Sequence, residues 1–278
     1  VPALCDEITG RGEFLTAYVP GHRAPHYPKG MAKLIPAGSK LAFQLHYTPI
    51  GTPQKDLSRL GLTYAKSDET IDRVVVTQQA SNHRGLVIPP NAENHRVEAR
   101  SQTSPTDVEI LAFMPHMHLR GKSFSYAAHF PDGRKETLLD VPQYDFNWQT
   151  AYRVARPVSL PRGAYLQCTA HFDNSENNLS NPDPTKTVRW GDQTWNEMMI
   201  GYFDVAIPTE VLGLSTSKST SRTSQQTASS KRTKARVLEV LKAIRDFDRQ
   251  GNNNGKLEKN EVPAKHIPIF KMLDADKD

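Results

Sequence analysis

Residues 108–121 read VEILAFMPHMHLRG, an apolar stretch that runs into two histidines. Its first part, within 107–114, alternates apolar and other side chains at the period of a β-strand. Similar segments, separated by turns that contain Pro and Gly, lie at 40–48, 72–77, 123–130, 165–172 and 198–205. Recurrent short strands without a helical period between them predict a mainly β protein built of antiparallel β sandwiches.

The composition allows a hydrophobic core but no membrane span. The chain has 278 residues, of which 37% are hydrophobic, and a mean hydropathy of −0.59. No apolar stretch approaches the ~20 residues that a membrane helix needs. Cys5 and Cys168 are the two cysteines of the sequence, so it contains one disulfide at most and is not a disulfide-dense scaffold.

The clearest change of composition lies at 215–236, STSKSTSRTSQQTASSKRTKAR, which has no acidic residue and no apolar side chain larger than Ala. Such a segment cannot bury enough surface to offset its ordering entropy. The number of its basic residues exceeds the net charge of the whole chain, which is +5. These basic residues lack the neighbouring aromatic side chains of a nucleic-acid-binding site. After it, apolar residues recur at helical spacing. The expected domains are a partial β domain at 1–82, a second β domain at 83–210, a linker at 211–236 and a helical segment at 237–278.

Two histidines follow the strand quoted first. Because side chains alternate along a strand, His116 and His118 are expected on the same face, where their imidazoles can converge on one metal ion. A pair of solvated or hydrogen-bonded histidines is the alternative, so a third ligand is needed. The candidates are His171 and the adjacent Met198 and Met199, and alternation places Met199 among buried residues and frees Met198 for a site. Two imidazoles and a thioether form a soft ligand set that suits copper.

A further histidine, His46, lies in the segment LAFQLHYTP at 41–49. The alternating apolar residues of this segment form one strand face, which places His46 on the opposite, polar side. By itself this position is typical of an exposed strand histidine without a function.

Together these motifs resemble the copper type II, ascorbate-dependent monooxygenases. LAFQLHYTP, PHMHLRG, CTAHFDN and NEMMIGYF occur in this order, and the resemblance covers about residues 15–207. It implies two jelly-roll β sandwiches, the first truncated here, that each hold one copper and face each other across a cleft. It further implies that His116, His118 and Met198 are catalytic and bind the oxygen-activating copper, and that His46 is one ligand of an electron-transferring copper.

The activity implied by the resemblance is oxygen-dependent hydroxylation of a C–H bond. Copper is the implied cofactor, with ascorbate or another one-electron donor as reductant. The implied partners are a small-molecule substrate, dioxygen and the electron donor, with no nucleic acid and no membrane span. A bacterial-type protein in the periplasm or outside the cell is expected on the same ground.

The chain departs from the family at the electron-transferring copper. That site needs an adjacent His-His pair, and no such dipeptide occurs in the sequence. Either the pair belongs to a part of the first sandwich that precedes Val1, or this copper and its activity have been lost. The second reading makes the chain a non-catalytic copper-binding or interaction module of the same fold.

Two smaller departures concern a cysteine and the substrate. In the animal members of the family, the cysteine that aligns with Cys168 bonds to the position held here by Met199, so Cys168 is expected to be a buried free thiol. Tyr202 matches a substrate-binding tyrosine. Met114 and Ile200 occupy the positions of the Arg and Asn that hold a peptide carboxylate, so a glycine-extended peptide is not the expected substrate.

The C-terminal segment resembles an EF-hand with a second loop that is cut short. Taking Glu261 as the twelfth ligand puts neutral amides at the first, third and fifth positions, which predicts weak calcium binding; Asp248 serves instead if the loop is longer. The candidate calcium ligands are Asp248, Gln250, Asn252, Asn254, Glu261, Asp274, Asp276 and Asp278. An Asn- and Gly-rich turn without metal is the alternative.

Overall fold

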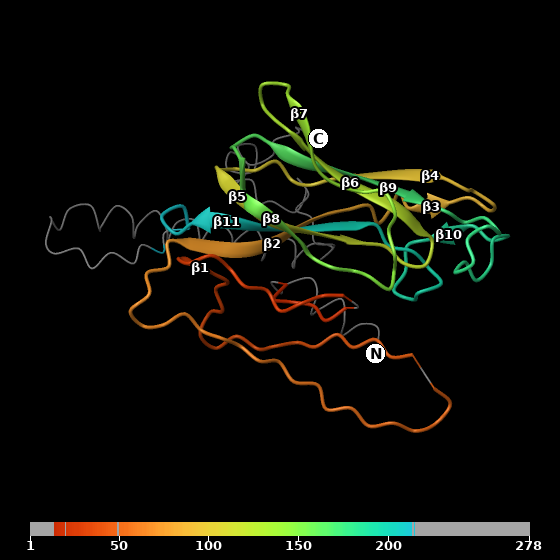
Figure 1. The fold of residues 1–278 in the computed structure, drawn as a ribbon, viewed down its shortest axis with the longest axis horizontal. Coiled ribbons are helices and arrows are strands. Elements are labelled where there is room, and N and C mark those ends of the chain that lie inside the picture. Colours follow the sequence, from red (N-terminus) through yellow and green to blue (C-terminus); the bar gives the residue numbers. More distant parts are fainter. Residues whose placement is uncertain (1–13, 20, 49, 213, 215–278) are drawn as a thin grey trace, which may run out of the picture. The chain divides into compact units, whose positions relative to one another are not determined.

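The structure, a computed structural model, describes residues 14–19, 21–48, 50–212 and 214. The strands in this part of the chain are β1 (Met31–Ala32), β2 (Arg73–Ser81), β3 (Val87–Ile88), β4 (His95–Arg100), β5 (Val108–His116), β6 (Gly121–His129), β7 (Lys135–Val141), β8 (Tyr152–Leu160), β9 (Tyr165–Phe172), β10 (Val188–Arg189) and β11 (Ile200–Pro208) (Figure 1). No helix among the described residues is long and apolar enough to cross a membrane.

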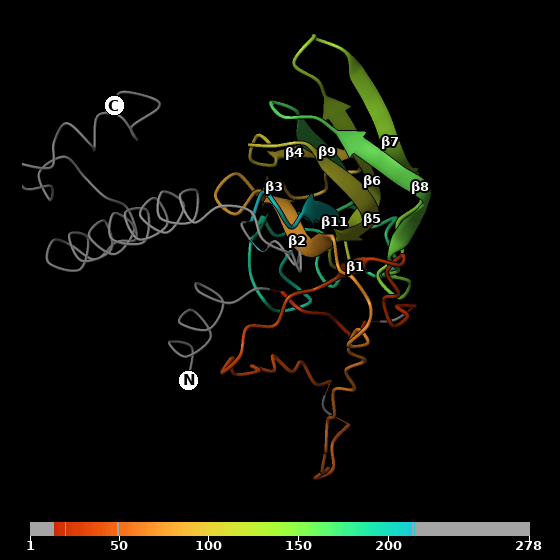
Figure 2. The same cartoon turned by 90° about the vertical axis from the view of Figure 1, so that its left-hand side faces the viewer.

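The strands form a two-layer sandwich. One sheet has the order β1-β2-β11-β5-β8 and the other has the order β4-β9-β6-β7, with a small β10-β3 pair beside them. All pairs are antiparallel except β1 with β2. Figure 2, turned by 90°, shows the four-stranded sheet lying over the five-stranded sheet. The mainly β class predicted from alternation is therefore confirmed.

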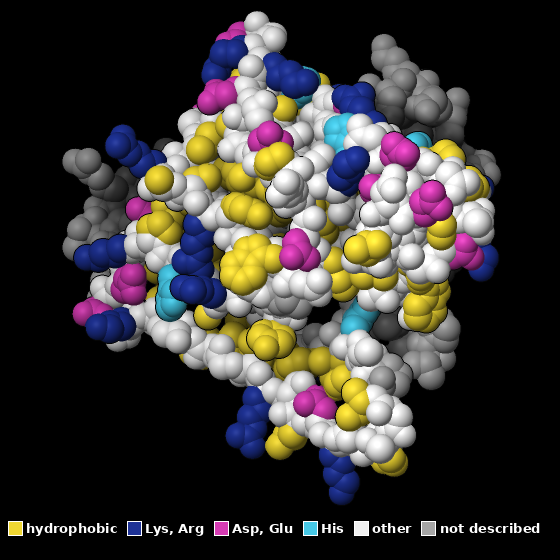
Figure 3. Space-filling model, turned by 45° about the vertical axis from the view of Figure 1, so that its right-hand side comes forward, with side chains coloured by type: hydrophobic (Ala, Val, Ile, Leu, Met, Phe, Trp, Pro, Cys, Tyr) yellow, Lys and Arg dark blue, Asp and Glu magenta, His cyan; other side chains and the backbone are white. Residues whose placement is uncertain are grey.

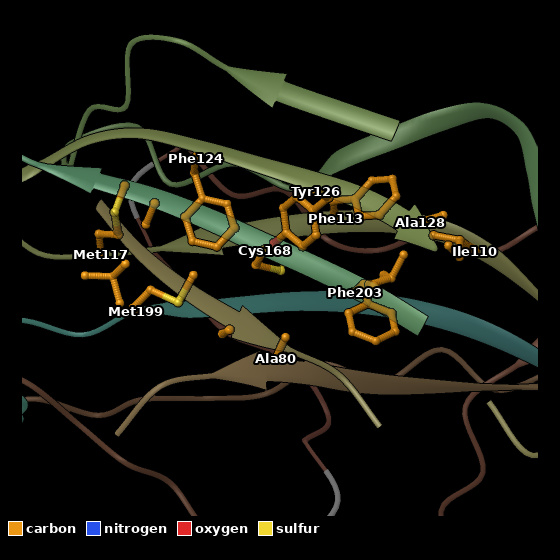
Figure 4. Close-up of a cluster of buried hydrophobic side chains, with 14 of the residues drawn as sticks. Ala80, Ile110, Phe113, Met117, Phe124, Tyr126, Ala128, Cys168, Met199 and Phe203 are labelled. Atoms are coloured by element: carbon orange, nitrogen blue, oxygen red, sulfur yellow. The ribbon is translucent and has the colours of Figure 1, made fainter. Parts of the chain in front are cut away.

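The core lies between the two sheets. Phe113 and Phe203 come from the five-stranded sheet, and they pack with Phe124, Tyr126 and Cys168 of the four-stranded sheet (Figure 4). Along β9 every second residue is buried, which is the pattern of a strand with one face in a core. Cys168 is fully buried and carries no disulfide, as expected, and burial raises the pKa of its thiol.

The expected strand at 40–48 does not form. The described residues between Ala32 and Arg73 contain no strand, and the apolar side chains of this segment are exposed, among them Phe43 and Tyr47. A strand with one apolar face is stable only when another layer covers that face. The segment instead belongs to the red-to-orange extension at the bottom of Figure 2, which in Figure 3 forms a lower lobe with hydrophobic side chains on its surface.

The domain boundaries stay a prediction. The described residues fall in one compact unit, in which β2 lies in the sheet of β11 and β5. The predicted linker except for residues 211, 212 and 214, the expected EF-hand segment with all its candidate calcium ligands, and Cys5 lie outside the described residues.

We expect Gly201→Ala to lower the free energy of unfolding by about 1–3 kcal/mol, because core overpacking forces neighbours out of place. A Cβ at Gly201 would press into the Cys168 sulfur and lie 3.0 Å from the Tyr126 ring. Gly61→Ala is the control, since nothing lies within 4 Å of the place that its added methyl group would take. Urea denaturation measures both variants, and equal midpoints would contradict this account of the core.

Candidate metal centre

The two histidines of the HMH motif lie where the chain passes from one sheet to the other. β5 ends at His116 and β6 begins at Gly121, in the opposite sheet. His118 is therefore in the connecting turn and not on the strand, so the expectation that strand alternation aligns the pair is wrong. The two rings nevertheless meet, with centroids 5.2 Å apart and planes at 81°.

A tyrosine holds one side of this turn. The Tyr144 hydroxyl donates to the Met117 carbonyl at 2.7 Å and accepts from the Met117 amide at 3.1 Å. At Gly121 a Cβ would lie 2.7 Å from the Tyr144 ring and 2.8 Å from Met117 Cβ. The glycine is required because the turn and Tyr144 leave no room for a side chain.

A glutamine fixes the orientation of the His116 ring. His116 Nδ1 lies 2.7 Å from Gln149 Oε1, and Gln149 is buried and donates its own amide to the Phe146 carbonyl. An amide oxygen only accepts, so Nδ1 carries the proton and Nε2 presents its lone pair. This is the tautomer that a metal-binding histidine needs.

A backbone carbonyl fixes the orientation of the His118 ring in the same way. Its Nδ1 lies 3.3 Å from the Asn196 carbonyl oxygen, which again leaves Nε2 as the lone-pair nitrogen. Burial lowers the pKa of His116 to about 4 and also lowers the pKa of His118. Both imidazoles are then neutral at neutral pH, the form in which histidine binds metal.

His46 is exposed and lies in the extended segment rather than on a strand. Its charge contributes to lowering the pKa of both His116 and His118, after the larger effect of burial. It is thus within electrostatic reach of the pair. His171, the other candidate ligand, lies on β9 in the four-stranded sheet, where its Nδ1 is 3.0 Å from the Ser123 hydroxyl.

The two adjacent methionines separate as alternation predicts. Met199 is fully buried in the core, whereas Met198 is half-buried. Ile200 pairs with His116 across β11 and β5, so Met198, two residues before it, lies beside the end of β5. The burial of Met199 is confirmed, and the role of Met198 as a ligand stays a prediction.

Sequence reasoning missed the carboxylate of Glu197. This fully buried residue accepts the His118 amide at 2.7 Å and the Arg120 amide at 2.6 Å. Burial raises its pKa to about 8, while the amides and the charge of Arg120 act in the opposite direction. The sequence offers one signal, an acidic residue directly before Met198, and it does not reveal the partners, which lie 77–79 residues away.

A cavity of about 180 Å³ lies on the outer face of the same sheet. Met114 and Tyr202 pair across β5 and β11, and both line it. Met114 is two residues before His116 on that face, which corresponds to roughly 7 Å along a strand. Among the polar side chains that line the cavity, the Thr77 hydroxyl donates to Asp204 at 2.5 Å, and Lys33 Nζ lies 2.6 Å from the same hydroxyl.

The residues present fit a copper ion. No group of three His, Cys, Asp or Glu side chains within the described ranges could hold a metal ion, so the pair needs a ligand of another kind. Two neutral imidazoles with both Nδ1 atoms engaged supply nitrogen donors, and the half-buried Met198 offers a soft sulfur donor. Copper accepts such a set, whereas magnesium and calcium require oxygen ligands.

Comparisons with known proteins bear on the family. No curated protein matches the sequence. Among solved structures, the infectious bursal disease virus Gt strain structure is similar at a TM-score of 0.27 and 12% identity, over 60% of this chain and 39% of that one, a likeness too low to carry an argument. The family model of the copper type II ascorbate-dependent monooxygenase C-terminal domain matches residues 74–226, more than half of the chain. The chain therefore belongs to the copper type II ascorbate-dependent monooxygenase family.

Proposed function

We propose that the protein binds copper through His116, His118 and Met198 and hydroxylates a C–H bond with dioxygen, using ascorbate or a similar one-electron donor. The observation that carries the proposal is the pair of neutral imidazoles, 5.2 Å apart, with both Nδ1 atoms held by acceptors. Bound copper would supply the one-electron chemistry and the activation of dioxygen that protein side chains lack.

The protein's own groups prepare this site. Gln149 and the Asn196 carbonyl set the tautomers of the two histidines, so that both Nε2 lone pairs are available without loss of a proton. Phe146, whose ring centroid lies 6.1 Å from that of His118, places an apolar group beside the ligand. An apolar surrounding limits the access of water to the metal.

The cavity beside the site indicates the class of substrate. An apolar cavity of about 150 Å³ can hold benzene, so a cavity of about 180 Å³ accommodates a small ring or a short branched chain. Met114, two residues before His116 on β5, lines the cavity, and so do the hydrogen-bonded polar side chains of Thr77 and Asp204. We propose a small molecule whose apolar C–H group points toward Met114 and whose hydroxyl or amide group reaches Asp204.

The first test is copper content. The wild-type chain should bind copper through the pair, and His116→Ala with His118→Ala should abolish it because two of three donors are gone. Elemental analysis after dialysis measures the ratio of copper to protein. His171→Ala, a histidine in the other sheet, is the matched control and should keep its copper. Unchanged copper in the double variant would refute the site.

The second test separates the thioether from the imidazoles. Met198→Leu should retain most of its copper but lose ascorbate-driven oxygen consumption, because a soft sulfur donor favours the reduced metal. Met199→Leu is the control, since that side chain faces the core and should alter stability alone. An active Met198→Leu variant would show that the sulfur is dispensable. A wild-type chain that binds copper without consuming oxygen would favour the non-catalytic module.

The third test fills the cavity. Ala112 is half-buried on β5 and lines the cavity, so Ala112→Phe should abolish saturable binding of toluene, a probe of fitting size. Chemical-shift titration of labelled protein follows the binding. Ala127→Phe, on a half-buried position of β6 in the other sheet, is the control. Equal toluene binding by both variants would argue against the cavity as the site.

A further inference from the structure

We propose that Glu197 is a positioning residue that fixes His118 and Met198 relative to each other, through a buried network with Arg120 and Asn174. This inference rests on the proposed copper site. It concerns residues that do not themselves contact the metal. It explains how His118, a ligand in a turn, and Met198, a ligand before a strand, come to lie at the same metal site.

The carboxylate joins the two ligand-bearing segments. One oxygen, Oε2, accepts the backbone amide of His118 at 2.7 Å, and Oε1 accepts that of Arg120 at 2.6 Å. Glu197 also directly precedes Met198 in the chain. Glu197 is therefore hydrogen-bonded to the backbone of one proposed ligand, His118, and is the covalent neighbour of the other, Met198.

Arg120 and Asn174 hold this group in place. Arg120 is 2% exposed, and its guanidinium donates from Nε to Asn174 Oδ1 at 2.8 Å and from Nη1 to the Trp195 carbonyl at 2.9 Å. Asn174 is fully buried and donates to the Pro89 and Lys186 carbonyls at 2.8 and 2.9 Å. The network thus ends on backbone groups of three separate segments, which cannot shift independently.

Simple packing does not require a buried carboxyl group. Burying such a group costs free energy because it has to leave water, and an apolar side chain of similar volume would fill the same space without that cost. A buried carboxylate here has a feature that apolar groups lack, since it accepts a hydrogen bond at each of two fixed oxygens. Partners that orient metal ligands in this way typically change metal affinity about 10- to 100-fold when they are altered.

Glu197→Gln in the full chain tests the role. The amide keeps the shape but turns one acceptor into a donor that faces a backbone N–H. We expect the affinity for Cu(I), measured by competition with a chromophoric chelator, to fall about 10- to 100-fold. X-ray absorption should show weaker copper–sulfur scattering with both imidazoles retained. Glu98→Gln, a carboxylate on β4 that accepts from Gln167, is the control and should leave both signals unchanged.

The sulfur signal distinguishes positioning from stability. A merely structural Glu197 would lower the melting temperature and leave the copper–sulfur scattering of the folded variant as in the wild type, which would overturn the inference. If Glu197→Gln does not fold, Asn174→Ser removes support from Arg120 without placing a donor against Glu197, and the same loss of sulfur scattering is expected. Wild-type protein without copper–sulfur scattering would instead refute the proposed copper site itself.

Discussion

The crossing of the chain from one sheet to the other, between His116 and Gly121, constrains the rest of the site. A crossing inside a sandwich buries backbone amides that no neighbouring strand can pair, and an unpaired buried amide costs about 1–3 kcal/mol. Tyr144 and Glu197 supply the missing partners. Because these partners come from distant parts of the chain, the hydrogen bonds to the amides of the turn also bring the segment before β11 against the end of β5.

The same burial sets the chemistry of the histidines. Removing an imidazole from water disfavours its charged form, and the acceptors at Gln149 and Asn196 select which nitrogen keeps the proton. A site prepared in this way loses no proton when a cation binds. The charge of Arg120 acts to lower the pKa of Glu197, against the larger effect of burial, which raises it.

The alternation of apolar and polar residues in the sequence was sufficient to predict the buried face of a strand wherever a second layer covers that strand. It predicted β9 to the residue, because one face of that strand lies in the core, and it separated the buried Met199 from the half-buried Met198 just before β11. It failed at 40–48, where the pattern is equally regular but none of the described residues covers the apolar side. It also could not predict Glu197 as a member of the site, since a contact across 79 residues depends on sheet order, which a local period does not contain.

An irregularity in β5 helps to explain how the outer face of the five-stranded sheet is covered beside the cavity. The register of β5 against β8 shifts between Ile110 and Ala112, so Ile110 and Phe113, three residues apart, both lie in the main core, whereas Leu111 lies in a small cluster with Val75 and Ala206. Tyr27 and Met31 cover that cluster. A bulge re-aims a side chain in this way without breaking the sheet. This apolar contact holds Tyr27 and Met31 against the outer face, where Tyr27 and Pro28 line the cavity together with Met114.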